Sequence, residues 1–140
     1  MGDGKQLLER FGNAILGNGE LEQIATPDVE YHDASANAKG IAEVEKYLQG
    51  WWTAFPDATV TVSNVVSEGD QAVGEMTYSG TQTGPMTGPA GEIPPTGRSV
   101  ELKGAAWITI RDGKIARFNG YYDTMSMMVQ LGLMPAPASV

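Results

Sequence analysis

The chain has 140 residues, 41% of them hydrophobic, and it contains no cysteine. This size and composition predict one domain spanning residues 1–140, and they argue against intrinsic disorder, disulfides and a thiolate zinc site. Acidic residues outnumber basic ones by 17 to 9, for a net charge of -8, and no basic run stands out, so nucleic acid and anionic membranes are poor partners.

The first half of the chain carries helical patterns. Apolar residues at positions 7, 8, 11, 14 and 15 predict an amphipathic helix, and positions 21–25 predict a second, short helical piece. Residues 28–33, DVEYHD, alternate like a short strand. From Gly40, an apolar stripe through positions 41, 44, 48, 51 and 55 predicts a long helix, which Pro56 ends.

The second half has a period of two. Residues 58–66 and 71–80 predict one pair of strands, and residues 99–110 and 114–123 predict another. Asp112 and Gly113 join the second pair, and Asp-Gly between alternating segments is a strong hairpin signal. A short helix is expected after residue 123, ending at Gly132. Helices followed by an antiparallel sheet predict an α+β fold.

Residues 80–98 form a long connection with five glycines and four prolines. Connections of this length are usually functional or disordered. Two interpretations stay open: a mobile hairpin tip, or a lid over the mouth of a pocket.

Strand alternation predicts which side chains share a face. With a two-residue turn and no bulge, Asn119, Tyr121 and Asp123 lie on the same face as Ile108. The other face then carries Trp107, Phe118 and Tyr122. A few polar groups on an apolar wall are typical of a small-molecule site, so Asn119, Tyr121 and Ile108 are predicted to bind substrate. A bulge would shift this register.

Asp123 is the candidate general base. A carboxylate on the wall of an apolar pocket is desolvated, and desolvation raises its pKa toward the range that suits a base near neutral pH. The alternative is that Asp123 caps the following helix, because aspartate is a favoured N-cap residue.

His32 is the single histidine. It is predicted either as a second acid/base group, oriented by a neighbouring carboxylate, or as a structural surface residue. A single histidine cannot form a multi-histidine metal site, and the acidic residues do not have the spacing of metal ligands, so no metal site is predicted. Trp51 and Phe55 end the stripe of the long helix and are predicted either to pack in the core or to wall the pocket.

Several segments resemble the SnoaL-like polyketide cyclases, or ester cyclases, of the nuclear-transport-factor-2-like superfamily. They are AFPDATVTVSNVVSEGDQAVGEMTYSGTQTG, PPTGRSVELKGAAWITIRDGKIARFNGYYD and QLGLMP, and YHDA at residues 31–34 resembles the family's His-Asp segment. The likeness runs from about residue 7 to residue 135. Two places depart from the family pattern: Arg117 and Asn119 stand where it often has glutamate and tryptophan, and residues 104–106 are small where it often has a polar side chain.

The resemblance implies a cone-shaped barrel, in which a curved antiparallel sheet packs on N-terminal helices around a deep cavity. It also implies cofactor-free aldol closure of a polyketide ester, with Asp123 as the acid/base residue and His32 lining the cavity. The expected partner is a small hydrophobic carbonyl compound. An isomerase or retro-aldol activity, or a binding module without catalysis, remains the alternative. We further expect a homodimer or higher homo-oligomer, and a cytoplasmic location, since the sequence shows neither a signal-peptide pattern nor a membrane-spanning stretch.

Overall fold

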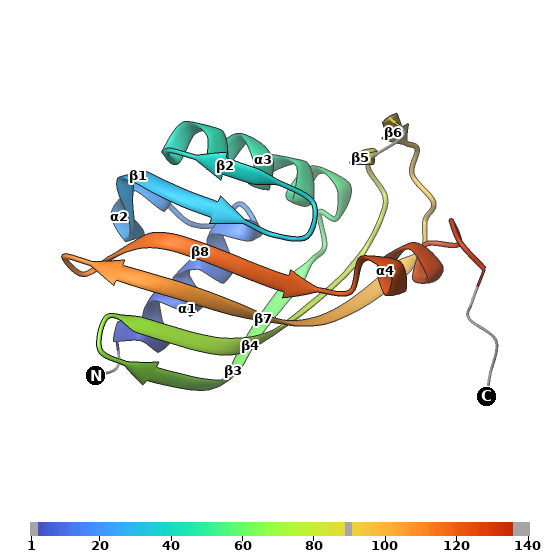
Figure 1. Cartoon of the computed structure of the whole chain (residues 1–140). Helices are drawn as coiled ribbons and strands as arrows, with labels where there is room; N and C mark the ends of the chain where they lie inside the picture. Colours follow the sequence, from blue (N-terminus) through green and yellow to red (C-terminus); the bar gives the residue numbers. More distant parts are fainter. Residues whose placement is uncertain (1–2, 89–90, 136–140) are drawn as a thin grey trace.

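The computed structural model describes residues 3–88 and 91–135, and within them one curved sheet of six strands packs against helices on its inner side (Figure 1). The strand order is β2-β1-β8-β7-β4-β3. The strands are β1 (Ala25–His32), β2 (Asn37–Lys39), β3 (Thr59–Glu68), β4 (Gln71–Thr81), β7 (Ser99–Arg111) and β8 (Lys114–Tyr122). The helices are α1 (Asp3–Ile15), α2 (Leu21–Ile24), α3 (Ile41–Ala54) and α4 (Thr124–Gln130). The α+β prediction is confirmed, with one difference: β1 and β8 pair in parallel.

Local sequence signals position these elements as predicted. Asp112 and Gly113 both have positive φ, 54° and 76°, which is the backbone of a two-residue hairpin turn. Helix α4 begins after Asp123 and is followed by Gly132 with φ of 76°. The apolar stripes of α1 and α3 face inward, where α1 contacts β3, β4 and β7 while α3 contacts β1. Among the described residues, no helix is long and apolar enough to span a membrane.

The predicted β7–β8 register is wrong beyond the turn. Ile110 pairs with Ile115 as expected, but Thr109 pairs with Arg117, so Ala116 is an extra residue in β8. This bulge exchanges the faces of all later β8 residues, because side chains alternate along a strand. The side chains of Phe118 and Tyr122 therefore turn inward.

The bulge also changes the outer face of the sheet. Asn119 pairs with Trp107 and Tyr121 with Ala105, so both polar residues lie on the outer side. The side chains of Trp107 and Tyr121 are 46% and 60% exposed. The face that was expected to carry Trp107, Phe118 and Tyr122 thus contains Trp107 alone of the three, and the homodimer stays a prediction.

The core aligns aromatic rings that later matter for the site. Phe11 of α1 stacks on Phe118 of β8 with ring centroids 4.1 Å apart, and Phe118 lies 5.2 Å from the Tyr31 ring and parallel to it. All three rings are almost completely buried. This stack fixes the direction in which β1 carries its inward side chains.

Gln82 organises the long connection between β4 and β7. Its side chain is fully buried and donates to the carbonyl oxygens of Gly84 and Pro94, both at 3.2 Å. Its side-chain oxygen accepts from the Thr96 amide and hydroxyl, at 3.2 and 2.8 Å. The connection carries a small hairpin, β5 (Met86–Gly88) and β6 (Gly91–Ile93), which stands beyond the end of α3 (Figure 1). Residues 89–90, which belong to the connection predicted as either a mobile hairpin tip or a lid, lie outside the described residues, and both interpretations stay predictions.

Candidate active site

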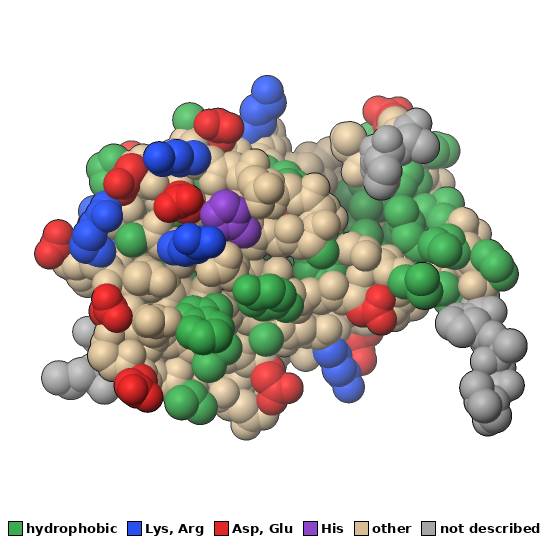
Figure 2. All heavy atoms as spheres, viewed as in Figure 1, with side chains coloured by type: hydrophobic (Ala, Val, Ile, Leu, Met, Phe, Trp, Pro, Cys, Tyr) green, Lys and Arg blue, Asp and Glu red, His purple; other side chains and the backbone are tan. Residues whose placement is uncertain are grey.

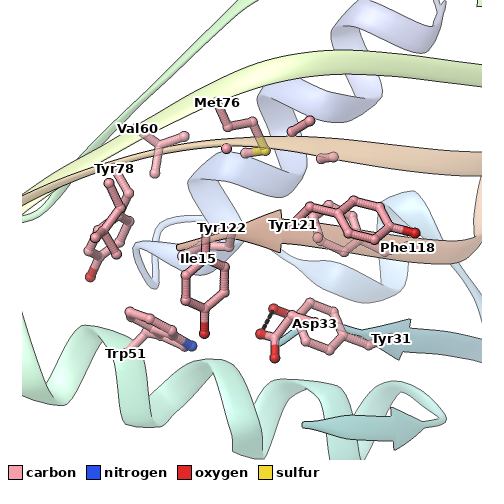
Figure 3. Close-up of a pocket in the computed structure, with 15 residues that line it drawn as sticks. Ile15, Tyr31, Asp33, Trp51, Val60, Met76, Tyr78, Phe118, Tyr121 and Tyr122 are labelled. Atoms are coloured by element: carbon pink, nitrogen blue, oxygen red, sulfur yellow. Dashed lines mark hydrogen bonds between the residues drawn. The ribbon is translucent and has the colours of Figure 1, made fainter. Parts of the chain in front are cut away.

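The structure contains two neighbouring hollows, an inner cavity and an open outer cleft. The inner cavity, of about 80 Å³, lies between the sheet, α1 and α3 (Figure 3). The outer cleft, of about 960 Å³, is open and bordered by residues 34–38, α3, the β5–β6 hairpin and α4. Figure 2 shows hydrophobic side chains gathered where the hairpin and α4 approach each other. Trp51 of α3 lines both hollows, so it stands at the boundary between them.

The walls of the inner cavity are mostly apolar. They include Ile15 of α1, Val60 of β3, Met76 of β4 and Leu102 of β7. Gly104 contributes a bare stretch of backbone. A Cβ at this position would lie 2.1 Å from the carbonyl oxygen of Tyr121, so only glycine fits the close approach of β7 and β8.

Asp33, directly after β1, is the carboxylate that lines this cavity. Its Oδ2 accepts hydrogen bonds from the hydroxyls of Tyr31, at 2.6 Å, and Tyr47, at 2.8 Å. Its Oδ1 accepts from the backbone amides of Ser35 and Ala36, at 2.7 and 2.9 Å. Both carboxylate oxygens are therefore held in position, with the Asp33 side chain turned toward the hollow (Figure 3).

Tyrosine hydroxyls surround the carboxylate. Burial, reinforced by the negative charge of Asp33, raises the pKa of Tyr31 and Tyr47 well above the usual value of 10.0 for tyrosine. Burial likewise raises the pKa of Tyr122, whose hydroxyl lies 2.9 Å from the Ser35 hydroxyl. At neutral pH these three side chains are neutral, so their hydroxyls can donate hydrogen bonds to an anionic oxygen.

Comparison with protein families gives a match over residues 7–131 to the model described as SnoaL-like polyketide cyclase. The chain belongs to the SnoaL-like polyketide cyclase family. A comparison with curated proteins found no match.

Solved structures show the same fold for this SnoaL-like chain. A candidate SnoaL-like polyketide cyclase from Jannaschia sp. CCS1 has a TM-score of 0.81 and 22% identity, covering 95% of this chain and 94% of that one. TsrD from Streptomyces laurentii has a TM-score of 0.79 and 28% identity, covering 94% and 96%. An NTF2-like protein of unknown function from Burkholderia pseudomallei has a TM-score of 0.72 and 17% identity, covering 94% and 98%. The predicted nuclear-transport-factor-2-like fold is therefore confirmed.

Asp123 lies at the N-cap of α4, as the alternative interpretation predicted. The residue is exposed, and its Oδ1 accepts a hydrogen bond from the Ser126 amide at 3.0 Å, at the N-terminus of α4. It borders neither hollow. The expected desolvated position on the pocket wall is wrong, because the bulge in β8 moves this end of the strand by one residue. Its catalytic role stays a prediction that this geometry does not favour.

His32 points away from the inner cavity. Strand alternation places Tyr31 inward and His32 outward, where its Nδ1 lies 2.6 Å from Asn37 Oδ1 and its Nε2 lies 3.6 Å from Glu30 Oε1. Figure 2 shows the histidine at the surface among charged side chains. In the His-Asp segment, therefore, Asp33 and not His32 reaches the hollow, and the predicted cavity position of His32 is wrong.

The predicted substrate-binding residues divide into two groups. Trp51 lines both hollows, and the fully buried Phe55 borders the outer cleft. Ile108 is also fully buried but packs in the core away from both hollows. Asn119 and Tyr121 lie on the outer face of the sheet; Tyr121 is at the cavity's border, yet its side chain is mostly exposed. The pocket-floor interpretation is wrong for Asn119, which lines neither hollow because of the β8 bulge, whereas substrate binding by Tyr121 stays a prediction.

Sequence reasoning missed Asp33 and the tyrosines around it. One signal could have found the carboxylate: the alternation of residues 28–33 places Val29, Tyr31 and Asp33 on one face and His32 on the other. The inward direction of Tyr122 depends on the β8 bulge, and nothing in the sequence indicates that bulge. Within the described part of the chain, no three His, Cys, Asp or Glu side chains gather as metal ligands would.

Proposed function

We propose that this protein catalyses the cofactor-free ring closure of a polyketide ester by acid/base chemistry, with Asp33 as the base. The observation that carries the proposal is the position of Asp33: a carboxylate held by four hydrogen bonds at the edge of a mostly apolar cavity. Membership of the SnoaL-like polyketide cyclase family supports the reaction class. Fold alone does not fix the reaction, so the residues must carry the argument.

The sizes of the two hollows indicate how a substrate would lie. Pockets for drug-sized ligands are typically about 300–1,000 Å³, so the inner cavity is too small for a fused aromatic skeleton while the outer cleft is large enough. The aromatic body would occupy the outer cleft. The reacting ester and ketone end would pass Trp51 and enter the inner cavity beside Asp33.

The reaction needs only a proton that leaves and returns. Asp33 Oδ2 takes a proton from the carbon between the ester and ketone carbonyls, which leaves a delocalised enolate. The enolate carbon attacks a second ketone of the same molecule, one C–C bond forms, and the new alkoxide takes the proton back from Asp33. Substrate and product are isomers, so the balance requires no oxidant or reductant. In this proposal the Tyr122 hydroxyl donates a hydrogen bond to the developing oxyanion, a contribution of about 3 kcal/mol for a well-aimed donor.

Binding without catalysis is the second candidate, and one observation favours it. All four hydrogen bonds of Asp33 stabilise the anion, so the carboxylate also has a purely structural explanation. An isomerase or retro-aldol step would use the same residues as the ring closure, because each passes through an enolate and needs one group to take up and return a proton.

The deciding experiment compares Asp33→Asn with Asp123→Asn on one substrate. A suitable probe is an aromatic β-keto ester that bears a second ketone within ring-closing reach, and the product is an isomer of equal mass separated by chromatography. We expect Asp33→Asn to lower turnover at least about a hundredfold, as loss of a general base does, and Asp123→Asn to change it little. Circular dichroism and probe binding confirm that each variant is folded.

The other outcomes are informative as well. Full activity in a folded Asp33→Asn variant excludes Asp33 as the base. A wild-type protein that binds the probe tightly but never converts it supports the binding module.

A further inference from the structure

Tyr78 of β4 has a buried hydroxyl in the wall of the inner cavity. The residue is only 9% exposed, and its ring meets Trp51 and Phe55 edge-on, with centroids 5.4 and 5.7 Å away. Figure 3 shows its hydroxyl directed toward the Trp51 side of the cavity. Among the described residues this hydroxyl finds no hydrogen-bond partner.

The other cavity tyrosines differ in this respect. Tyr31 and Tyr47 donate to Asp33, and Tyr122 is within hydrogen-bond distance of Ser35. Buried polar groups in proteins are almost always paired, so one that remains unpaired calls for an explanation. Burial, reinforced by the charge of Asp57, raises the pKa of Tyr78 above the usual 10.0 for tyrosine, so its hydroxyl keeps its proton and can donate.

We propose that Tyr78 is a ligand-binding residue whose hydroxyl donates a hydrogen bond to a ketone or ester oxygen in the inner cavity. A carbonyl oxygen accepts a hydrogen bond and carries no charge into an apolar site. The Trp51 and Phe55 rings would hold the flat group that carries this carbonyl. The inference rests on the part of the proposed function in which the inner cavity receives a carbonyl compound, and it is independent of whether Asp33 acts as a base.

The arrangement implies opposite effects on stability and binding. Replacing Tyr78 with Phe keeps the ring and its aromatic contacts and removes only the unpaired hydroxyl. Without ligand, the variant escapes the cost of burying an unpaired polar group, so it should be at least as stable as the wild type. With ligand, it loses a hydrogen bond that the wild type forms.

The test uses 2-acetylnaphthalene labelled with ¹³C at the carbonyl carbon. Its naphthalene ring suits the outer cleft and its acetyl group the inner cavity. We expect the ketone carbon resonance to move downfield on binding to the wild type and to move less in Tyr78→Phe. Affinity should fall about 3- to 10-fold, the range of one neutral hydrogen bond. The Tm of the ligand-free variant should equal or exceed that of the wild type.

Thr26→Val is the matched control, because it removes another buried hydroxyl, in β1 and outside both hollows. Its affinity and ketone resonance should match the wild type. Equal affinity and an equal resonance shift in Tyr78→Phe overturn the inference, as does a wild type that does not bind the ketone. A lower Tm of ligand-free Tyr78→Phe also overturns it, since the hydroxyl would then already have a partner. Asp33→Asn, measured in parallel, separates the two proposals: turnover reports on Asp33, and ketone binding reports on Tyr78.

Discussion

Asp123 provides a sharp test, because asparagine and alanine separate a helix cap from a catalytic base. Its carboxylate accepts one hydrogen bond, from the Ser126 amide at 3.0 Å, and the side chain is exposed. Asparagine caps helices about as well as aspartate, whereas alanine cannot cap at all. We therefore expect Asp123→Ala to lose about 1 kcal/mol of unfolding free energy and Asp123→Asn to lose almost none. For a chain of this length, 1 kcal/mol corresponds to a fall in Tm of about 3–4 °C.

Differential scanning calorimetry on the two variants measures the stability, and turnover of the β-keto ester measures the chemistry. Helix α4 borders the outer cleft through Met125, Met127 and Met128, so Asp123→Ala should also weaken substrate binding slightly. Asp123→Asn should leave kcat within about twofold of the wild type. A hundredfold lower kcat in Asp123→Asn with an unchanged Tm would refute this reasoning, because only a reacting carboxylate distinguishes aspartate from asparagine there.

Two further predictions concern the pH dependence of stability and the long connection between β4 and β7. The raised pKa values of Tyr31, Tyr47 and Tyr122 mean that above pH 10 the unfolded chain loses protons that the folded chain keeps, so the free energy of unfolding should fall as pH rises beyond 10. Because Tyr121 is exposed, the measurement uses Tyr121→Phe, in which the remaining tyrosinate absorbance should appear together with the loss of circular dichroism. An earlier appearance would contradict the burial of these tyrosines. Gln82→Leu should leave the Thr96 amide without its hydrogen-bond partner and lower the free energy of unfolding by about 1–3 kcal/mol. Amide hydrogen exchange should become faster, and only in residues 84–97. Protection equal to the wild type would show that the hairpin does not depend on Gln82.

The sequence predicted the elements well because their signals are local. The apolar stripe of α3, the Asp112-Gly113 turn and the alternation of β3 and β4 are each local patterns, and the longest of these elements, α3, has 14 residues. The parallel pairing of β1 with β8 is different in kind. It joins segments more than eighty residues apart, and no local pattern encodes such a partner.

The β8 side of the site was harder to predict because one residue decides its register. Ala116 looks like any other strand residue, yet as a bulge it exchanges the roles of Tyr121 and Tyr122. The same shift ends the strand so that Asp123 reaches the first turn of α4 and not the cavity. When side-chain directions are inferred from strand alternation, one error in the register misassigns every later residue of the strand. The predicted faces of β8 are therefore wrong for all residues between the bulge and the end of the strand.

Gly104 affects the inner cavity in two ways. Residues 104–106 of β7 are small, and Gly104 borders the inner cavity. A Cβ at this position would also clash with the Tyr121 carbonyl oxygen, so the glycine lets β7 and β8 approach closely at this point. Tyr122 pairs with Gly104 across that approach, and its ring crosses the cavity edge-on to Trp51 with centroids 5.8 Å apart. The width of the inner cavity therefore depends on this backbone contact as much as on the absence of a side chain at Gly104. This width limits which substrate groups can pass Trp51 and reach Asp33.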